Sequence, residues 1–406
     1  MRVPIRRFSL LTAVALVAAL GSASAATNSL GRIDFPNSGA PAAQDDFLRG
    51  VLLLHSFEYD DARQAFQRAQ EIDPDFALAH WGEAMTHNHP LWREQDRDAA
   101  LAALADYAPT PEARRAKAPT EREAGYLAAV DLLYGEGDKL ERDLAYSDAM
   151  GELAERYPDD LEARAFYALS ILGTAQAERD FRIYMRAAAV AEEVFAANPL
   201  HPGAAHYLIH SYDDPVHAPL GLRAARVYDD IAPAASHAQH MISHIFVALG
   251  HWADSVDSNV RAYQVSKERR EERDLQVDQL NYHALHWLQY SYLQLGRRDD
   301  ARRILDLMRG YAEESGTSRA LWHYAVMRAM WNVETLGADP PPPMGYDVLE
   351  LAGVAQDLFA DGLVSVRADD LDAARAHRLS LAERRAEAAE DGAREGLLRT
   401  AEVLEL

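Results

Sequence analysis

The sequence predicts an all-α protein made of stacked pairs of antiparallel helices. Helix-stopping prolines recur at Pro158, Pro199 and Pro233, and proline ends a helix because it lacks a backbone N–H and clashes with the preceding turn. Small residues, Ala187 and Gly221, lie twelve positions before the last two of these prolines, where the two helices of a pair can approach closely. The interval from Pro199 to Pro233 is 34 residues, which fits one helix-turn-helix unit of a repeat array.

These stops, together with the Leu-Gly turns at Gly250 and Gly296, divide the chain into helix pairs. The predicted pairs span residues 45–73, 77–106, 120–157, 160–198, 202–232, 235–267 and 276–314, and a degenerate pair begins at 317. Because stacked repeats form one continuous body, residues 45–336 are expected to be a single helical solenoid.

The segments that flank this array have different compositions. Residues 26–44 are rich in Ser, Gly, Ala and Pro, which is typical of a flexible N-terminal arm. Residues 337–346 contain four consecutive prolines and are expected to form an extended break. Residues 347–406 are expected to be helical and to cap the stack with a polar outer face, since they end in a stretch dense in Arg, Glu and Ala.

The first residues have the composition of a signal peptide. Three arginines and no acid precede the apolar stretch 8–20, which is shorter than the roughly 20 residues that a membrane-spanning helix needs. A small-residue site, Ala-Ser-Ala, follows and ends at Ala25. Residues 1–25 are therefore predicted to be a signal peptide cleaved near Ala25, which makes the mature protein periplasmic or secreted and leaves it no membrane anchor.

Charge and cysteine content exclude several classes of function. Without the signal peptide, 38 basic residues face 64 acidic ones, a net charge of −26. This charge repels phosphate backbones and anionic membrane surfaces, so nucleic acid is not an expected partner. The chain has no cysteine, so disulfides cannot stabilise it and buried apolar area must. No Gly-rich phosphate loop, nucleophile elbow or HExxH motif is present.

One segment carries a resemblance to a known family. Residues 58–74 read EYDDARQAFQRAQEIDP, with Ala62, Phe66 and Pro74 spaced as in the second half of a tetratricopeptide repeat. The chain therefore resembles the tetratricopeptide repeat (TPR) superfamily over most of residues 45–336, and HPGAAHYLIHSYDDP and SHAQHMISHIF look like segments of exported bacterial repeat proteins. This resemblance implies a superhelical solenoid whose concave groove binds a peptide or protein partner.

Histidine is concentrated in one part of the chain, because half of the 16 histidines lie between His201 and His251. In the TPR family, positions 2, 5, 9, 12 and 13 of the first helix of each repeat point into the groove. In that register the groove residues are His206, His210, Asp213 and Asp214 of one repeat, His237, His240 and His244 of the next, and His283, His286 and Tyr290 of the third. Helix geometry supports this independently, since residues three or four apart share a face.

Imidazoles on neighbouring helices can converge on a metal ion. Packed helices lie about 8–10 Å apart, and histidine nitrogens bind transition metals at about 2.0–2.1 Å. A site of imidazoles with at most one carboxylate suits Zn, Cu or Fe rather than Ca or Mg. The candidate ligands are two i,i+4 pairs, His206 with His210 and His240 with His244, to which His286 or Asp214 could add a ligand.

Three functional interpretations stay open at this point. The first is an exported binding or scaffold protein whose His-lined groove holds a peptide or protein partner. A peptide carboxyl terminus is not the expected ligand, because TPR proteins that clamp one use Lys and Asn where this chain has His. The second is a metal-binding protein, which would extend to a metal-dependent enzyme of unknown reaction with Asp213, Asp214 or Tyr290 as acid or base. The third is a structural seam of hydrogen-bonded histidines.

A few further residues have two interpretations each. Trp81 and Met85 fall at groove positions of the second repeat, but core packing explains them equally well. His87 and His89 precede a proline and are expected to be capping or turn residues. His217 follows an Asp-Asp-Pro break and is a turn residue or a ligand supplied by a loop.

Overall fold

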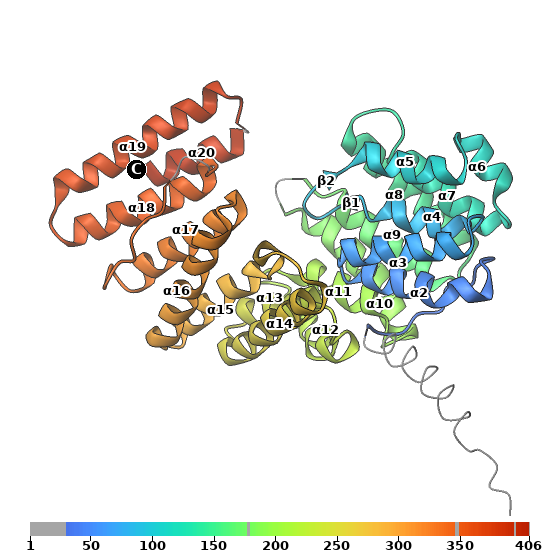
Figure 1. Ribbon diagram of the computed structural model, residues 1–406, viewed down its shortest axis with the longest axis horizontal. Helices are drawn as coiled ribbons and strands as arrows, with labels where there is room; N and C mark the ends of the chain where they lie inside the picture. Colours follow the sequence, from blue (N-terminus) through green and yellow to red (C-terminus); the bar gives the residue numbers. More distant parts are fainter. Residues whose placement is uncertain (1–29, 177–178, 346–348, 394, 406) are drawn as a thin grey trace, which may run out of the picture. The chain divides into compact units, whose positions relative to one another are not determined.

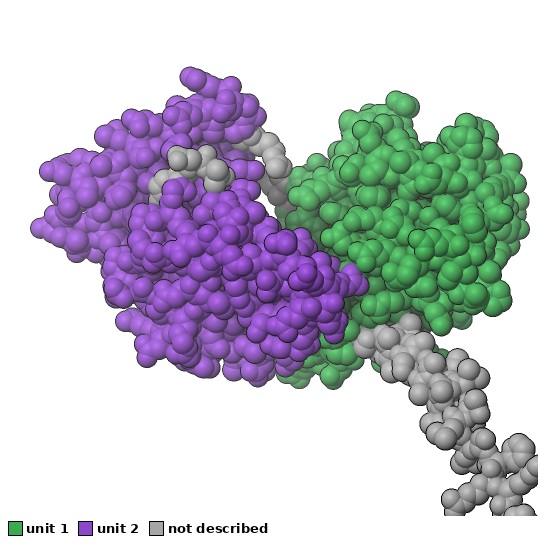
Figure 2. All heavy atoms as spheres, in the orientation of Figure 1, with its two compact units in different colours: residues 1–249 green, residues 250–406 purple. Residues whose placement is uncertain are grey.

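The computed structural model describes residues 30–176, 179–345, 349–393 and 395–405. The chain divides into two compact units, Met1–Leu249 and Gly250–Leu406, which Figure 2 shows in separate colours. The predicted signal peptide lies outside the described residues. Among the described helices, none is both long enough and apolar enough to span a bilayer.

In the first unit every helix from α2 to α12, except α5, packs against the next one along the chain (Figure 1). Their bounds are α2 Gln44–His55, α3 Tyr59–Ile72, α4 Ala77–Met85, α5 Arg97–Tyr107, α6 Pro111–Lys117, α7 Glu121–Leu133, α8 Lys139–Arg156, α9 Leu161–Gly173, α10 Phe181–Ala197, α11 Pro202–Tyr212, α12 Ala218–Ile231 and α13 Ser236–Ala248. Short connections make neighbours antiparallel. The predicted all-α class and its antiparallel helix pairs are confirmed.

The second unit continues with the same kind of pairing. Its helices are α14 Trp252–Arg273, α15 Tyr282–Gln294, α16 Arg298–Ser315, α17 Ser318–Glu334, α18 Leu351–Arg367, α19 Leu371–Glu390 and α20 Glu395–Glu405. Residues 335–345, which follow α17, are non-helical, and the carbonyl groups of Pro341 and Pro342 accept hydrogen bonds from Arg328 and Tyr324 of α17. The division between the units falls inside the predicted pair 235–267, between α13 and α14.

Local signals set where several helices begin. The carboxylate of Asp160 accepts hydrogen bonds from the backbone N–H groups of Glu162 and Ala163 at the start of α9. Asp138 and Glu141 form a capping box at the start of α8. Such caps satisfy donors that have no partner within the helix, so they fix the helix start from sequence alone.

Phe66 explains why small residues recur in this repeat. Its ring is fully buried, and a Cβ atom added to Gly82 of α4 or to Gly50 of α2 would lie 2.4 or 2.7 Å from it. Only glycine leaves room for the ring between these helices. The Phe66 ring of α3 therefore fills the space between its own helix and both α2 and α4.

Two elements of the first unit were not expected from the sequence. Between α4 and α5 the chain forms a short antiparallel hairpin of β1 Asn88–His89 and β2 Glu94–Gln95. His89 belongs to this hairpin, where its ring stacks on Tyr59 with the ring centroids 4.0 Å apart. Helix α6 fills the connection to α7, and Arg114 of α6 binds Asp131 of α7 through its guanidinium.

The described part of the N-terminal segment is packed, which differs from the expectation of a flexible arm over residues 26–44. The 3-10 helix η1 Pro41–Ala43 precedes α2, and the side chains of Leu30 and Phe35 are 1% and 3% exposed. The Phe35 ring lies 5.5 Å from that of Phe47 and 5.9 Å from that of Trp81. Apolar anchors of this kind order a segment whose composition alone suggests a mobile one.

Helix α2 packs against α4 and also against α11, although α11 comes much later in the chain. The approach is close, because a Cβ atom on Gly203 of α11 would lie 2.3 Å from the imidazole of His55 in α2. Side chains of α4 that face α2 have little room for solvent. Trp81 and Met85 are 0% and 4% exposed, so they are core residues rather than groove residues.

Candidate functional site

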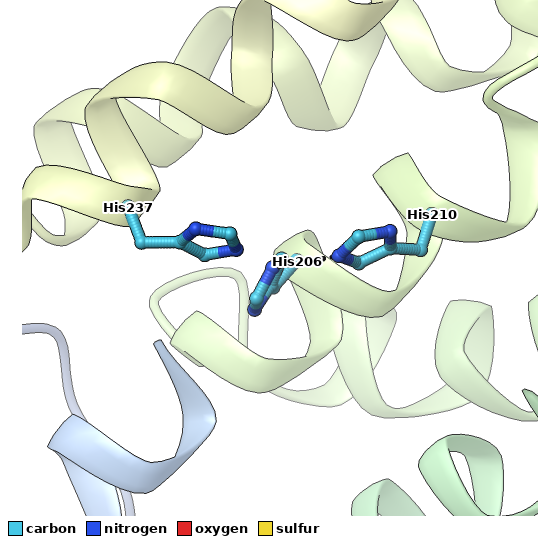
Figure 3. A group of neighbouring side chains, drawn as sticks. All are labelled: His206, His210 and His237. Atoms are coloured by element: carbon cyan, nitrogen blue, oxygen red, sulfur yellow. Dashed lines mark hydrogen bonds between the residues drawn. The ribbon is translucent and has the colours of Figure 1, made fainter. Parts of the chain in front are cut away.

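Helices α11 and α13 pack against each other and carry five of the predicted histidines. His206 and His210 are one turn apart on α11 and therefore share its face. His237, His240 and His244 lie on one face of α13 for the same reason. Figure 3 shows His237 reaching from its helix toward His206 and His210 on the other.

His206, His210 and His237 form a compact group of nitrogen donors. One ring nitrogen from each lies within 4.8 Å of the other two, and the Nε2 atoms of His206 and His210 are 3.1 Å apart. Two nitrogens bound to one zinc ion in tetrahedral geometry are about 3.3 Å apart, given Zn–N bonds of about 2.0–2.1 Å. The i,i+4 pair therefore already has the spacing of two ligands of a single ion.

The ring orientation of His206 is fixed by a second hydrogen bond. Its Nδ1 atom lies 2.7 Å from the backbone carbonyl oxygen of His55. A carbonyl can only accept, so Nδ1 carries the proton and Nε2 presents its lone pair toward His210. Metal-binding histidines are held in this way by a carbonyl or carboxylate on the other nitrogen.

Burial keeps the two α11 imidazoles neutral. It lowers the pKa of His206 to about 3. Burial also lowers the pKa of His210 well below the usual value, with His206 and His237 as neighbouring imidazoles that oppose a further positive charge. A neutral imidazole is the form that binds a metal, so neither ring has to lose a proton first at neutral pH.

His240 and His244 form a second pair with the same spacing. Their Nε2 atoms are 3.1 Å apart, and the Nδ1 atom of His244 lies 2.7 Å from the Oδ2 atom of Asp213. Burial alone would raise the pKa of Asp213, but His244 beside it lowers the pKa below its usual value. Asp213 is therefore an ionised acceptor that holds the His244 ring.

The four histidines of the two pairs do not form one donor group. The nitrogens of His240 and His244 are grouped apart from those of His206 and His210, which His237 joins instead. The sequence hypothesis placed both pairs around one ion. The structure instead puts His237, which lies in the first turn of α13, next to the α11 pair.

Asp214 lies outside both groups. Its carboxylate accepts hydrogen bonds from the backbone N–H groups of Val216 and His217 and from Arg179, and it lies 2.9 Å from the His217 ring. These bonds fix the turn that precedes α12. Asp214 and His217 are therefore turn residues, and the structure does not bring Asp214 to the predicted ligands.

The remaining predicted residues belong to the second unit. His283, His286 and Tyr290 lie on α15, and His286 is 6.1 Å, centroid to centroid, from His323 of α17. Burial lowers the pKa of His286 to about 4. Tyr290 packs edge-on against Trp252. Their meeting with the histidines of α11 and α13 in one groove stays a prediction, as does the groove itself.

The turn between α2 and α3 supplies contacts that the sequence did not indicate. Phe57 has a φ of +57°, which is rare for a bulky residue, and its ring centroid lies 4.3 Å from that of His206 and 5.6 Å from that of His237. Glu58 accepts a hydrogen bond from the backbone N–H of His237. Strained residues of this kind concentrate at functional sites. Only the packing of α2 on α11 could have revealed them.

A third cluster, deeper in the first unit, contains His55, Glu162 and His201, all 0% exposed. Glu162 lies 2.7 Å from Nε2 of His55 and 3.1 Å from Nε2 of His201. The Nδ1 atom of His201 accepts the backbone N–H of Ala204, so Nε2 must carry the proton in the neutral ring. If a metal bound Nε2 of His201, the ring proton would have to move to Nδ1. The Nδ1–H group would then face the backbone N–H of Ala204, and two donors cannot form a hydrogen bond. This cluster is therefore a hydrogen-bonded seam.

The charge of Glu162 gives a testable pH dependence. Burial opposes its ionisation, but His201 and His55 lower its pKa to about 2, against 4.5 for a free glutamate. As the pH falls, the Glu162 carboxylate is protonated in the unfolded chain at a higher pH than in the folded chain. The stabilisation that its charge contributes is therefore complete above about pH 4.5 and is lost as the pH falls toward 2. We expect the difference in unfolding free energy between wild type and Glu162→Gln to shrink as pH falls from 5.5 to 3.5. A difference that stays constant in urea titrations would contradict this.

Comparisons with known proteins add little to this geometry. No family model matches the sequence, and no curated protein matches it. Solved structures to which it is similar include yeast Tom70 (10% identity, 89% of this chain and 88% of that chain, TM-score 0.34) and the TPR domain of P58(IPK) (12%, 89% and 98%, TM-score 0.23). The Cut9–Hcn1 hetero-tetramer of APC/C is another (14%, 97% and 79%, TM-score 0.32). The fold class rests on the helix pairs of this chain itself.

Proposed function

We propose that this protein binds a transition-metal ion through His206, His210 and His237. The observation that carries the proposal is the 3.1 Å separation of the Nε2 atoms of His206 and His210, with the other nitrogen of His206 held by a carbonyl. Neutral, oriented imidazoles at this spacing favour Zn, Cu or Fe.

Three protein ligands leave a coordination position for water or a substrate. Closed structural zinc sites have four protein ligands, whereas catalytic zinc sites have three and an open position. This ligand number supports an ion that is open to exchange. A metal-bound water with a lowered pKa is the chemistry that such an ion supplies.

The peptide-binding interpretation receives less support from the same residues. His206 and His240, two of its predicted contacts, are 0% and 1% exposed. Fully buried rings offer a peptide no contact surface. The polar seam is the alternative for His206 and His210, because an N–H···N hydrogen bond also spans 3.1 Å.

We propose that this function is exercised in the periplasm or the medium, and the support for this is the predicted signal peptide. Histidine-only sites suit such compartments, because imidazole does not oxidise to a disulfide as cysteine does.

The test is metal content. The chain from residue 26 onward, carrying no polyhistidine tag, is stripped with a chelator, dialysed separately against Zn(II), Cu(II) and Fe(II), and measured by plasma mass spectrometry. We expect at least one equivalent of one of these metals. His251→Ala is the matched control, because His251 has a side chain 39% exposed and bonded to Asp254. Less than a tenth of an equivalent with every metal would refute the proposal.

A further inference from the structure

We propose that the site is dinuclear, with a second ion bound by His240 and His244 beside the first. This inference rests on the proposed function and extends it. The two ions would occupy neighbouring positions along the interface of α11 and α13.

The first argument is that the His240 and His244 pair repeats the geometry of the first pair. Both are i,i+4 pairs on first helices of consecutive repeats, and in both the Nε2 atoms are 3.1 Å apart. A spacing that suits two ligands of one ion on α11 suits two ligands of another on α13.

The second argument is the orientation of His244. Its Nδ1 donates to the ionised carboxylate of Asp213 at 2.7 Å, so its Nε2 presents a lone pair toward His240. A zinc-binding imidazole usually donates a hydrogen bond to a carboxylate from the ring nitrogen that does not bind the metal. This carboxylate makes the imidazole a stronger ligand.

The third argument is the distance between the two sets. The rings of His237 and His240 are 6.4 Å apart, and those of His210 and His244 are 6.5 Å apart, centroid to centroid. The sets are thus adjacent, yet their donor nitrogens form separate groups. Two separate groups of donors suit two neighbouring ions better than one shared ion.

The fourth argument concerns charge. Two cations close together repel each other, and neutral imidazoles do not offset that repulsion. Carboxylates stand at both sets, since Asp213 binds His244 and Glu58 accepts the backbone N–H of His237. Two neighbouring ions, if bound, would supply positive charge that stabilises the oxygens of a hydrolysed or transferred group.

The experiment is the stoichiometry of the binding metal in wild type, His244→Ala and His206→Ala. We expect two equivalents in wild type and one in each variant. As a variant that keeps every imidazole, Asp213→Asn is expected to weaken one of the two equivalents by about 10- to 100-fold and to leave the other unchanged. Circular dichroism of the metal-free proteins verifies that each variant is folded.

The outcomes separate this inference from the proposed function. One equivalent in wild type that His244→Ala leaves in place overturns the dinuclear site, while the mononuclear one stands. If wild type binds one equivalent and both His244→Ala and His206→Ala abolish it, the two pairs share a single ion. That result also overturns the dinuclear site. No bound metal in wild type refutes both. With Cu(II), paramagnetic resonance should show coupled rather than isolated ions, and an isolated-ion spectrum at full loading counts against the second site.

Discussion

Replacing His206 by alanine is expected to weaken binding of the first metal ion by at least about 100-fold. Losing a residue that merely orients a ligand typically costs 10- to 100-fold in metal affinity, and His206 is proposed to be a ligand itself. The change removes the Nε2 atom that lies 3.1 Å from its partner on His210. Competition titration against a chelator of known affinity measures the effect.

Two controls separate ligand loss from misfolding. His206→Gln keeps an amide N–H that can donate to the His55 carbonyl but has no imidazole nitrogen, so it should lose the same ion. His251→Ala should bind as wild type does. Unfolding of the metal-free proteins in urea shows whether the alanine variant is also less stable, because the wild-type ring is fully buried. An unchanged affinity in both His206 variants would show that His206 is not a ligand.

Replacing Glu162 by alanine is expected to destabilise the folded chain by about 2–6 kcal/mol, because each of two buried donors left without an acceptor costs about 1–3 kcal/mol. Glu162 accepts from both His55 and His201, and all three are 0% exposed. Without the carboxylate, two buried imidazole N–H groups lose their acceptor. Urea unfolding at pH 7, in the presence of chelator, measures the free energy.

Variants at the same and at a distant position sharpen this prediction. Glu162→Gln retains an acceptor oxygen for one of the two imidazoles and should cost less than Glu162→Ala. Glu193→Ala should change the free energy by no more than about 0.5 kcal/mol, because its side chain is 65% exposed. A Glu162→Ala protein as stable as wild type would mean that the seam contributes nothing to folding.

The helix pairs were predictable because their signals are local. A helix-stopping proline acts within one or two turns, so Pro199 and Pro233 predicted the ends of α10 at Ala197 and of α12 at Ile231. The pairing of His206 with His210, and of His240 with His244, was also predictable, since four residues make about one helical turn.

The sequence alone therefore determined the class of fold, the helix pairs and the two histidine pairs. The tertiary structure decided that His237 joins the α11 pair, that the His55 carbonyl orients His206, and that Phe57 and Glu58 border the site. The first depends on α13 packing on α11, and the others depend on α2 and the turn after it meeting α11 and α13, through the burial of apolar faces far apart in the chain. Such packing depends on apolar area buried across the whole unit, and a short stretch of sequence does not show which distant helices will meet.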